Sequence, residues 1–180
     1  LAWLDLNTHD GQEYWLAMNL AGDYAKACHD DIHRRMAKAI GSRPAVTIEN
    51  HHNFAWEEVV DGRRCIVHRK GATPAGKGVL GIIPGSMTAP GFIVEGKGNP
   101  LSLASASHGA GRVLSRGACK STIKKSDMLK TLENQGVELI GGAVDEAPMA
   151  YKNIHAVMAL QDELVQALGT FTPKIVRMDK

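Results

Sequence analysis

The hydrophobic period of the chain changes at Gly41-Ser42-Arg43-Pro44. Before this segment, apolar side chains recur every three or four residues, as they do along one face of a helix. After it, short apolar stretches alternate with glycine-rich turns, a pattern typical of strands joined by tight turns. The sequence therefore predicts an α+β fold, in which a long N-terminal helix is followed by short strands in largely antiparallel hairpins.

The N-terminal helix is predicted to begin at Asp10, because Asp10 and Glu13 have the spacing of a capping box. Helical spacing continues to Ile40, and the glycine and proline that follow end the helix. A helix of about 30 residues is about 45 Å long. A break near Gly22 is therefore the alternative to one continuous helix.

Short strands are expected to make up most of the chain after this helix. Asp61-Gly62 is a typical hairpin turn between two of them. Gly71–Gly78 is expected to be a loop, and Ser126 can begin a short helix that ends at Gly136. The expected strands are Ala45–Glu49, Phe54–Val60, Arg63–His68, Val79–Ile83, Phe92–Glu95, Leu101–Ser107, Val137–Ile140 and Phe171–Met178.

The segment Tyr151–Leu168 is predicted to be a C-terminal amphipathic helix. Its apolar residues fall on one helical face, and Gly169 stands at the position where glycine commonly ends a helix. The length of 180 residues fits about one domain, so residues 1–180 are expected to form a single region.

Charge and cysteine usage limit the classes of function. The net charge is only +2, so a nucleic-acid partner must be held by a local patch rather than by the whole surface. The cysteines are three in number and far apart, which favours reduced thiols and a cytoplasmic setting. No apolar run is long enough to span a membrane.

Three partial motifs have simpler explanations. Gly71–Gly78 resembles a phosphate-binding P-loop, but Gly78 stands where a hydroxyl is needed and a strand-like stretch follows. Gly76–Gly81 has the spacing of a dinucleotide fingerprint but lacks its helix. His29 and His33 have zinc-site spacing, although a solvated helix face is the simpler interpretation.

Two segments that contain histidine are stronger candidates for a functional site than these partial motifs. In His51-His52-Asn53, an imidazole is either a metal ligand or a capping residue at the edge of the core. In the segment from Ser107 to Arg112, a strand is expected to lead to His108, and two glycines then allow close backbone approach to a ligand. A neutral imidazole there can act as base or nucleophile, and Arg112 and Arg116 suit phosphate. The alternative is a tight turn with a surface histidine.

Taken together, the segments resemble the RtcB family of RNA ligases, in the same order and over essentially all 180 residues. The matching pieces are Gly11-Gln12-Glu13-Tyr14, His52-Asn53, Val67–Ala72, Gly81–Met87, Ser107–Arg112, Asp145–Pro148, Tyr151-Lys152, and Phe171-Thr172-Pro173 running to Lys180.

The resemblance implies joining of RNA ends that carry a 2′,3′-cyclic phosphate or 3′-phosphate to 5′-hydroxyl ends, with GTP and Mn²⁺. His108 would take GMP covalently, and His52 would be a manganese ligand. Arg112, Arg116 and the Lys120–Lys125 stretch would hold RNA phosphates. The residues that would contact the nucleotide are Asn53, Pro84, Gly85, Ser86, Met87, Gly109, Ala110, Gly111, Tyr151 and Lys180.

Family members are much longer, and their N-terminal half supplies a cysteine, an aspartate and further histidines to the metals. The chain thus resembles the C-terminal part of the catalytic domain, and the N-terminal half is an expected partner besides RNA. A non-catalytic RNA-binding relative is the alternative function. A generic phosphate-binding α/β protein, with His52 and His108 far apart, is a third.

Overall fold

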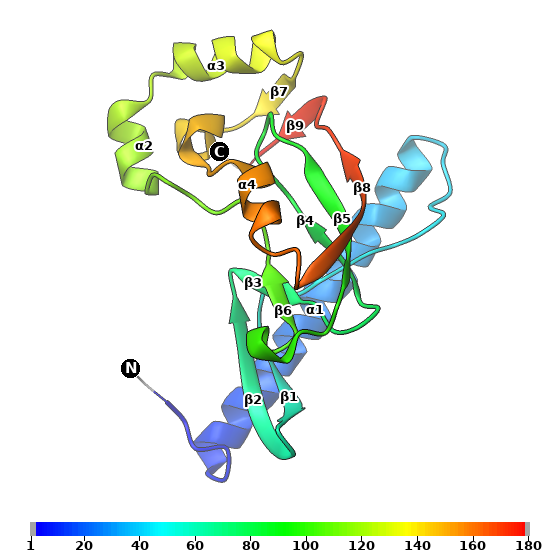
Figure 1. Ribbon diagram of the computed structural model, residues 1–180. Helices are drawn as coiled ribbons and strands as arrows, with labels where there is room; N and C mark the ends of the chain where they lie inside the picture. Colours follow the sequence, from blue (N-terminus) through cyan, green and yellow to red (C-terminus); the bar gives the residue numbers. More distant parts are fainter. Residues whose placement is uncertain (1–2, 179–180) are drawn as a thin grey trace. The chain divides into compact units, whose positions relative to one another are not determined.

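The computed structural model describes residues 3–178, so Lys180 lies outside the described residues. Backbone contacts divide the chain into two units, Leu1–Thr47 and Ile48–Lys180 (Figure 1). The first unit contains helix α1, and the second contains the strands and the shorter helices.

Helix α1 (His9–Ala39) is continuous through Gly22 and ends one residue before the predicted end. Its N-cap is Thr8 rather than Asp10: the Thr8 hydroxyl accepts from the Gly11 N–H at 3.2 Å. The prediction of Asp10 as the cap was wrong because Thr8 already satisfies this N–H, which leaves Asp10 in the first turn near the positive end of the helix dipole.

The segment 45–49, which was predicted to be a strand, lies outside every strand of the described chain. Just after this segment, the side chain of Asn50 forms hydrogen bonds with the backbone of β4 (Leu80–Ile83). The Asn50 amide donates to the Leu80 carbonyl at 3.1 Å and accepts from the Ile82 N–H at 3.3 Å. These contacts occupy the sheet edge without backbone pairing.

The second unit begins with the hairpin of β1 (Asn53–Val60) and β2 (Arg63–Lys70), as predicted. Val60 pairs with Arg63 across the turn. Asp61 and Gly62 both have positive φ, 48° and 76°, which matches the twist of the flanking strands.

Three further sheets complete the strands described. Strand β3 (Ala72–Pro74), inside the expected loop, pairs antiparallel with β6 (Ser105–Ser107). Strands β4 (Leu80–Ile83), β5 (Gly91–Gly96) and β8 (Val165–Phe171) form an antiparallel sheet in that order. Strands β7 (Glu138–Gly141) and β9 (Ile175–Arg177) pair in parallel. The predicted strands 101–107 and 171–178 are thus shorter, and the first begins with the 3₁₀ turn η1 (Pro100–Ser102).

The short helices are α2 (Arg116–Thr122), α3 (Lys125–Asn134) and α4 (Ile154–Ala159), with 3₁₀ turns η2 (Val144–Glu146) and η3 (Pro148–Ala150). The cap of α3 is Lys124, so Ser126 already lies inside that helix.

The C-terminal helix is much shorter than predicted. Asn153 caps α4 by accepting from the His155 N–H at 2.9 Å, so the helix starts after Tyr151. From Val165 onward the backbone pairs with β5, beginning with Val165 against Gly96. This ladder of hydrogen bonds outweighs the helical spacing of the apolar side chains.

Two clusters of buried side chains support this unit. One includes Ile83 and Val94 from the β4-β5-β8 sheet together with Ile154 of α4. The other includes Met128 and Leu132 of α3. The α+β class is confirmed, and the pairings are antiparallel apart from β7 with β9. Within residues 3–178, no helix has both the length and the apolarity needed to cross a bilayer.

Candidate active site

His52 and His108 lie side by side in the second unit. Their imidazole rings are stacked, with centroids 5.0 Å apart and planes 16° apart. The backbone of Gly71 connects them: its N–H donates to the His52 carbonyl at 3.1 Å, and its carbonyl accepts from the His108 N–H at 3.3 Å. The two histidines are therefore close together, as the ligase hypothesis requires.

A buried arginine fixes the strands that carry this pair. Arg69 of β2 is 2% exposed and forms two hydrogen bonds with the Glu58 carboxylate, at 2.6 and 3.0 Å. It also donates to the Ser105 hydroxyl at 2.8 Å and to the Leu103 carbonyl at 2.9 Å. These bonds hold β2, which leads to Gly71, against the start of β6, which leads to His108.

A cavity of about 660 Å³ opens beside His108, within the usual size range of small-molecule sites. One wall is polar and includes His108, Arg112, Arg116 and Tyr151. Most of the large apolar side chains in the lining come from the C-terminal segment. The complete lining is Pro84, Gly85, Ser86, Met87, His108, Gly109, Ala110, Gly111, Arg112, Arg116, Tyr151, Phe171, Pro173, Ile175, Val176, Arg177 and Met178.

The turn from Pro84 to Met87 is tightly packed. A Cβ added at Gly85 would lie 2.4 Å from the Pro90 carbonyl oxygen, so only glycine fits there. The Ser86 hydroxyl accepts from the Ala89 N–H at 3.2 Å. Because Ser86 acts as acceptor in the hydrogen bonds described here, its O–H remains available to donate to a ligand.

The loop from Gly109 to Gly111 follows His108 and contacts the same turn. The Ala110 N–H donates to the Pro84 carbonyl at 3.0 Å, and the Gly109 N–H approaches the Ser107 hydroxyl at 3.4 Å. Gly111 has a φ of +69°, which favours glycine. Within the described residues, only the N–H of Gly111 among these three is left to donate to a ligand, fewer than the sequence suggested.

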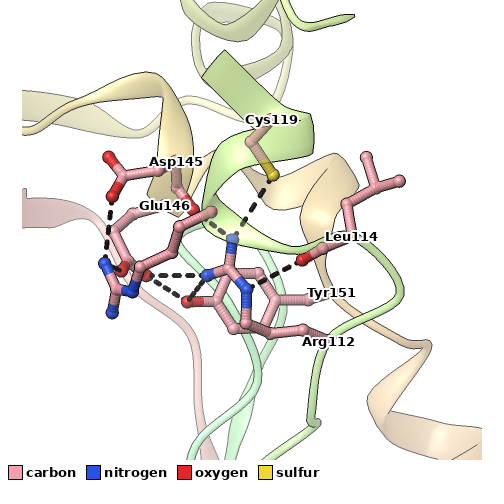
Figure 2. A network of polar contacts seen from close by, with 7 residues as sticks. Arg112, Leu114, Cys119, Asp145, Glu146 and Tyr151 are labelled. Atoms are coloured by element: carbon pink, nitrogen blue, oxygen red, sulfur yellow. Dashed lines mark hydrogen bonds and ion pairs between the residues drawn. The ribbon is translucent and has the colours of Figure 1, made fainter. Parts of the chain in front are cut away.

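Arg112, Arg116 and Tyr151 of the cavity lining form a polar network with Asp145 and Glu146, part of which is labelled in Figure 2. The guanidinium of Arg112 lies 5.0 Å from the centre of the Tyr151 ring and donates to the Tyr151 hydroxyl at 3.1 Å. Arg116 contacts Asp145 at 3.0 Å and Glu146 at 2.5 Å. The Tyr151 hydroxyl donates to Glu146.

These contacts shift proton affinities in opposite directions. The hydrogen bond from Arg116 holds the pKa of Asp145 below its ordinary value, so that carboxylate stays charged. Burial, followed by the hydrogen bond to Glu146, raises the pKa of Tyr151, so its hydroxyl keeps its proton. Tyr151 therefore acts as a hydrogen-bond donor to Glu146.

The remaining predicted residues lie outside the cavity lining. His52 is adjacent to it through its stacking on His108. Asn53 is exposed at the start of β1, where its side-chain oxygen accepts from Lys70 at 3.4 Å. The position of Lys180 is not described.

The residues described do not form a complete metal site. Residues 3–178 contain no group of three or more His, Cys, Asp or Glu side chains arranged to hold a metal ion. The same result applies to His29 and His33, so zinc-site spacing on α1 is not accompanied by further ligands. Among the described residues, His52 therefore belongs to no group of side chains that could hold a metal ion by itself.

Sequence reasoning missed most of the apolar side chains in the cavity lining. Phe171, Pro173 and the stretch 175–178 reach the cavity because β8 and β9 fold back onto elements distant in sequence. No local pattern indicates such a return. The only signal was the presence of Phe171-Thr172-Pro173 among the segments that resemble the family.

The family model described as tRNA-splicing ligase RtcB matches residues 1–179. The RNA-splicing ligase RtcB of Escherichia coli is 46% identical over 123 residues, which are 68% of this chain and 30% of that protein. The tRNA-splicing ligase RtcB of Nanoarchaeum equitans is 31% identical over 91% of this chain and 41% of its own length. The RNA-splicing ligase RtcB of Mycobacterium tuberculosis is 33% identical over 88% of this chain and 42% of its own length.

The chain therefore spans less than half the length of these curated relatives. The match to the family model covers nearly all of its residues, in agreement with the order of the segments from His52 to Tyr151. The chain belongs to the RtcB family of RNA-splicing ligases.

Proposed function

We propose that this chain is the C-terminal part of an RNA ligase that uses GTP and Mn²⁺. It joins 2′,3′-cyclic phosphate or 3′-phosphate ends of RNA to 5′-hydroxyl ends, in tRNA splicing or RNA repair. The observation that supports this best is the stacked pair of His52 and His108 next to the cavity. Family membership supports the general activity, and the geometry supports the roles of the individual residues.

His108 is the proposed nucleophile. A neutral imidazole nitrogen attacks the α-phosphorus of GTP, a P–N bond forms, and pyrophosphate leaves with the electrons of the broken P–O bond. The GMP then passes to the 3′-phosphate of RNA. Attack by the 5′-hydroxyl on that activated phosphate releases GMP and joins the strands.

The walls of the cavity orient the nucleotide in this proposal. The Ser86 hydroxyl and the Gly111 N–H donate to the ligand, while Tyr151 and Lys180 face the guanosine and Asn53 adjoins the GMP. Pro84, Gly85, Met87, Gly109 and Ala110 complete the pocket for GMP. The apolar side chains of β9 exclude water from the opposite side.

Manganese is held by His52 together with ligands from the N-terminal half found in longer family members. When bound, it supplies positive charge near the reacting phosphate. That N-terminal half is accordingly a proposed partner of this chain. A cytoplasmic location is also part of the proposal, supported by the three unpaired thiols.

The RNA backbone is proposed to approach along α2 and the start of α3. Arg116 is 66% exposed at the cavity, and Lys120 on the same helix is exposed and close enough to Asp145 to lower its pKa. Lys124 and Lys125 are exposed further along. A row of cations of this kind binds phosphates, and its affinity falls with salt.

The test is transfer of radioactive GMP from α-labelled GTP in the presence of Mn²⁺, with the chain alone and with the N-terminal half of a family member added. We expect an acid-labile label that is lost in His108→Asn and kept in His68→Asn, since His68 is exposed on β2 away from the cavity. Absence of label in both mixtures would overturn the proposal. Salt-dependent RNA binding without label would favour a non-catalytic RNA-binding relative.

A further inference from the structure

Arg112 has all of its hydrogen-bond donors occupied by the protein. A guanidinium carries five N–H groups. The Nε–H donates to the Leu114 carbonyl at 3.0 Å. Nη1 donates to the Tyr151 hydroxyl at 3.1 Å and to Glu146 at 3.5 Å. Nη2 donates to the Cys119 sulfur at 3.3 Å and to the Asp145 carbonyl (Figure 2).

Arg116 lines the same cavity but forms fewer contacts with the rest of the protein. Its side chain is 66% exposed, against 24% for Arg112. Both of its ion pairs use one terminal nitrogen, Nη1. Within the described residues, its Nε and second terminal nitrogen remain available to an anion, whereas Arg112 would have to break a protein contact to bind one.

Of the groups that Arg112 contacts, Tyr151 lines the cavity, as Arg112 itself does. Its guanidinium covers the face of the Tyr151 ring, and its backbone forms an antiparallel bridge with Tyr151. Next to this bridge, the Lys152 N–H donates to the Gly111 carbonyl at 3.0 Å. Through Glu146 and Cys119, Arg112 also joins η2 and α2. Arg112 therefore contacts Tyr151 through its side chain, and its backbone bridge joins the end of the Gly109–Gly111 loop to the Tyr151-Lys152 segment.

We propose that Arg112 is a positioning residue, which holds Tyr151 and the Gly109–Gly111 loop in place, and is not a ligand of substrate phosphate. This differs from the substrate-binding role implied by the family resemblance and leaves Arg116 as the phosphate-facing arginine. The inference rests on the proposed function only in taking this cavity as the binding surface for guanosine monophosphate.

Lysine substitution distinguishes the two roles. Arg112→Lys keeps the positive charge but has three donors on a single nitrogen and no planar fork. A lysine retains most of the attraction to a phosphate, but it cannot reach five acceptors arranged around a plane. A positioning role therefore predicts that Arg112→Lys behaves like Arg112→Ala.

Two measurements on the isolated chain test this. The first is NMR without nucleotide, following the Tyr151 ring, assigned with Tyr151→Phe, and the amide of Gly111. The second is GMP binding by isothermal titration calorimetry. We expect both Arg112 variants to shift both signals and to weaken GMP binding at least tenfold. The control His68→Asn, at an exposed position outside the cavity lining, should keep both signals and bind within threefold of wild type.

The proposal is overturned if Arg112→Lys leaves the Tyr151 and Gly111 signals in place, or binds GMP within threefold of wild type. A wild-type chain that binds no GMP counts against the proposed function, and the nucleotide-free spectra alone then decide the positioning role. If the Arg112 variants do not fold, Glu146→Gln replaces them, because it keeps the side-chain shape but removes the charge. Unchanged signals in that variant also overturn the proposal.

Discussion

Gly85 provides a sharp test of how tightly the cavity is built. An alanine Cβ at this position would lie 2.4 Å from the Pro90 carbonyl oxygen, 2.9 Å from the Ala89 Cβ and 3.0 Å from the Ala89 carbonyl oxygen. Two of these atoms belong to the backbone, so no flexible side-chain end can move aside. To reach even a 3.0 Å contact, the Pro84–Met87 turn and the 89–90 segment must separate by at least about 0.6 Å.

Overpacking of this kind costs about 1–3 kcal/mol. We therefore expect Gly85→Ala to lower the free energy of unfolding by that amount in urea denaturation. Under the proposed function this turn contacts the nucleotide. A misplacement of about 1 Å at such a turn costs about a hundredfold in rate, so the proposed guanylylation of His108 should also slow.

Gly117→Ala is the matched control. Its added Cβ has no heavy atom within 4 Å, and it lies in the first turn of α2. Alanine has a higher helix propensity than glycine. The free energy of unfolding of this variant should therefore equal that of the wild type or exceed it by about 0.5 kcal/mol. Equal urea midpoints for Gly85→Ala and the wild type would refute the packing argument, as would an equal loss in both variants.

Three further outcomes are expected. The Thr73 hydroxyl is buried without a hydrogen-bond partner in the described part of the chain, so Thr73→Val should raise the free energy of unfolding by about 1 kcal/mol in urea, and a loss of that size would contradict it. Leu132 is 2% exposed, so Leu132→Ala should cost about 2–5 kcal/mol by the same method, and a loss below 1 kcal/mol would contradict its place in the core. Arg116 lowers the pKa of Asp145, so their pairing stabilises the fold above the ordinary carboxyl range near pH ~4, and this contribution is lost as pH falls through the lowered value. Arg116→Gln should therefore flatten the acid side of a stability–pH curve, and an unchanged curve would exclude the pairing.

The sequence predicts most of the fold where one local signal acts alone. The β1–β2 hairpin follows from Asp61-Gly62, and the long helical spacing predicts α1 to within a residue or two at each end. Prediction failed where distant partners compete with local preference. Val165 and Leu168 have helical spacing with the preceding residues, but they lie in β8, the strand that pairs with β5.

In the candidate site too, features set by local sequence could be predicted, and features set by contacts between distant residues could not. The glycine turns that line the cavity and the strand that leads to His108 are local features of the sequence. That His52 stacks on His108 depends on hydrogen bonds through Gly71, which no spacing rule predicts. The occupation of every Arg112 donor likewise depends on η2, α2 and Tyr151 meeting in space, so the side chain's available donors could not be inferred from its position after Gly111.

The parallel pairing of β9 with β7 has a consequence for the timing of synthesis. Chains emerge with the N-terminal end first. A nascent chain that has reached only Thr170 can already form the β1–β2 hairpin and place His52 beside His108, but Pro173 and the residues of β9 are still missing from the cavity wall. The pocket therefore reaches its final shape only after residues 173–178 have been synthesised, and until then its lining lacks most of its C-terminal apolar side chains.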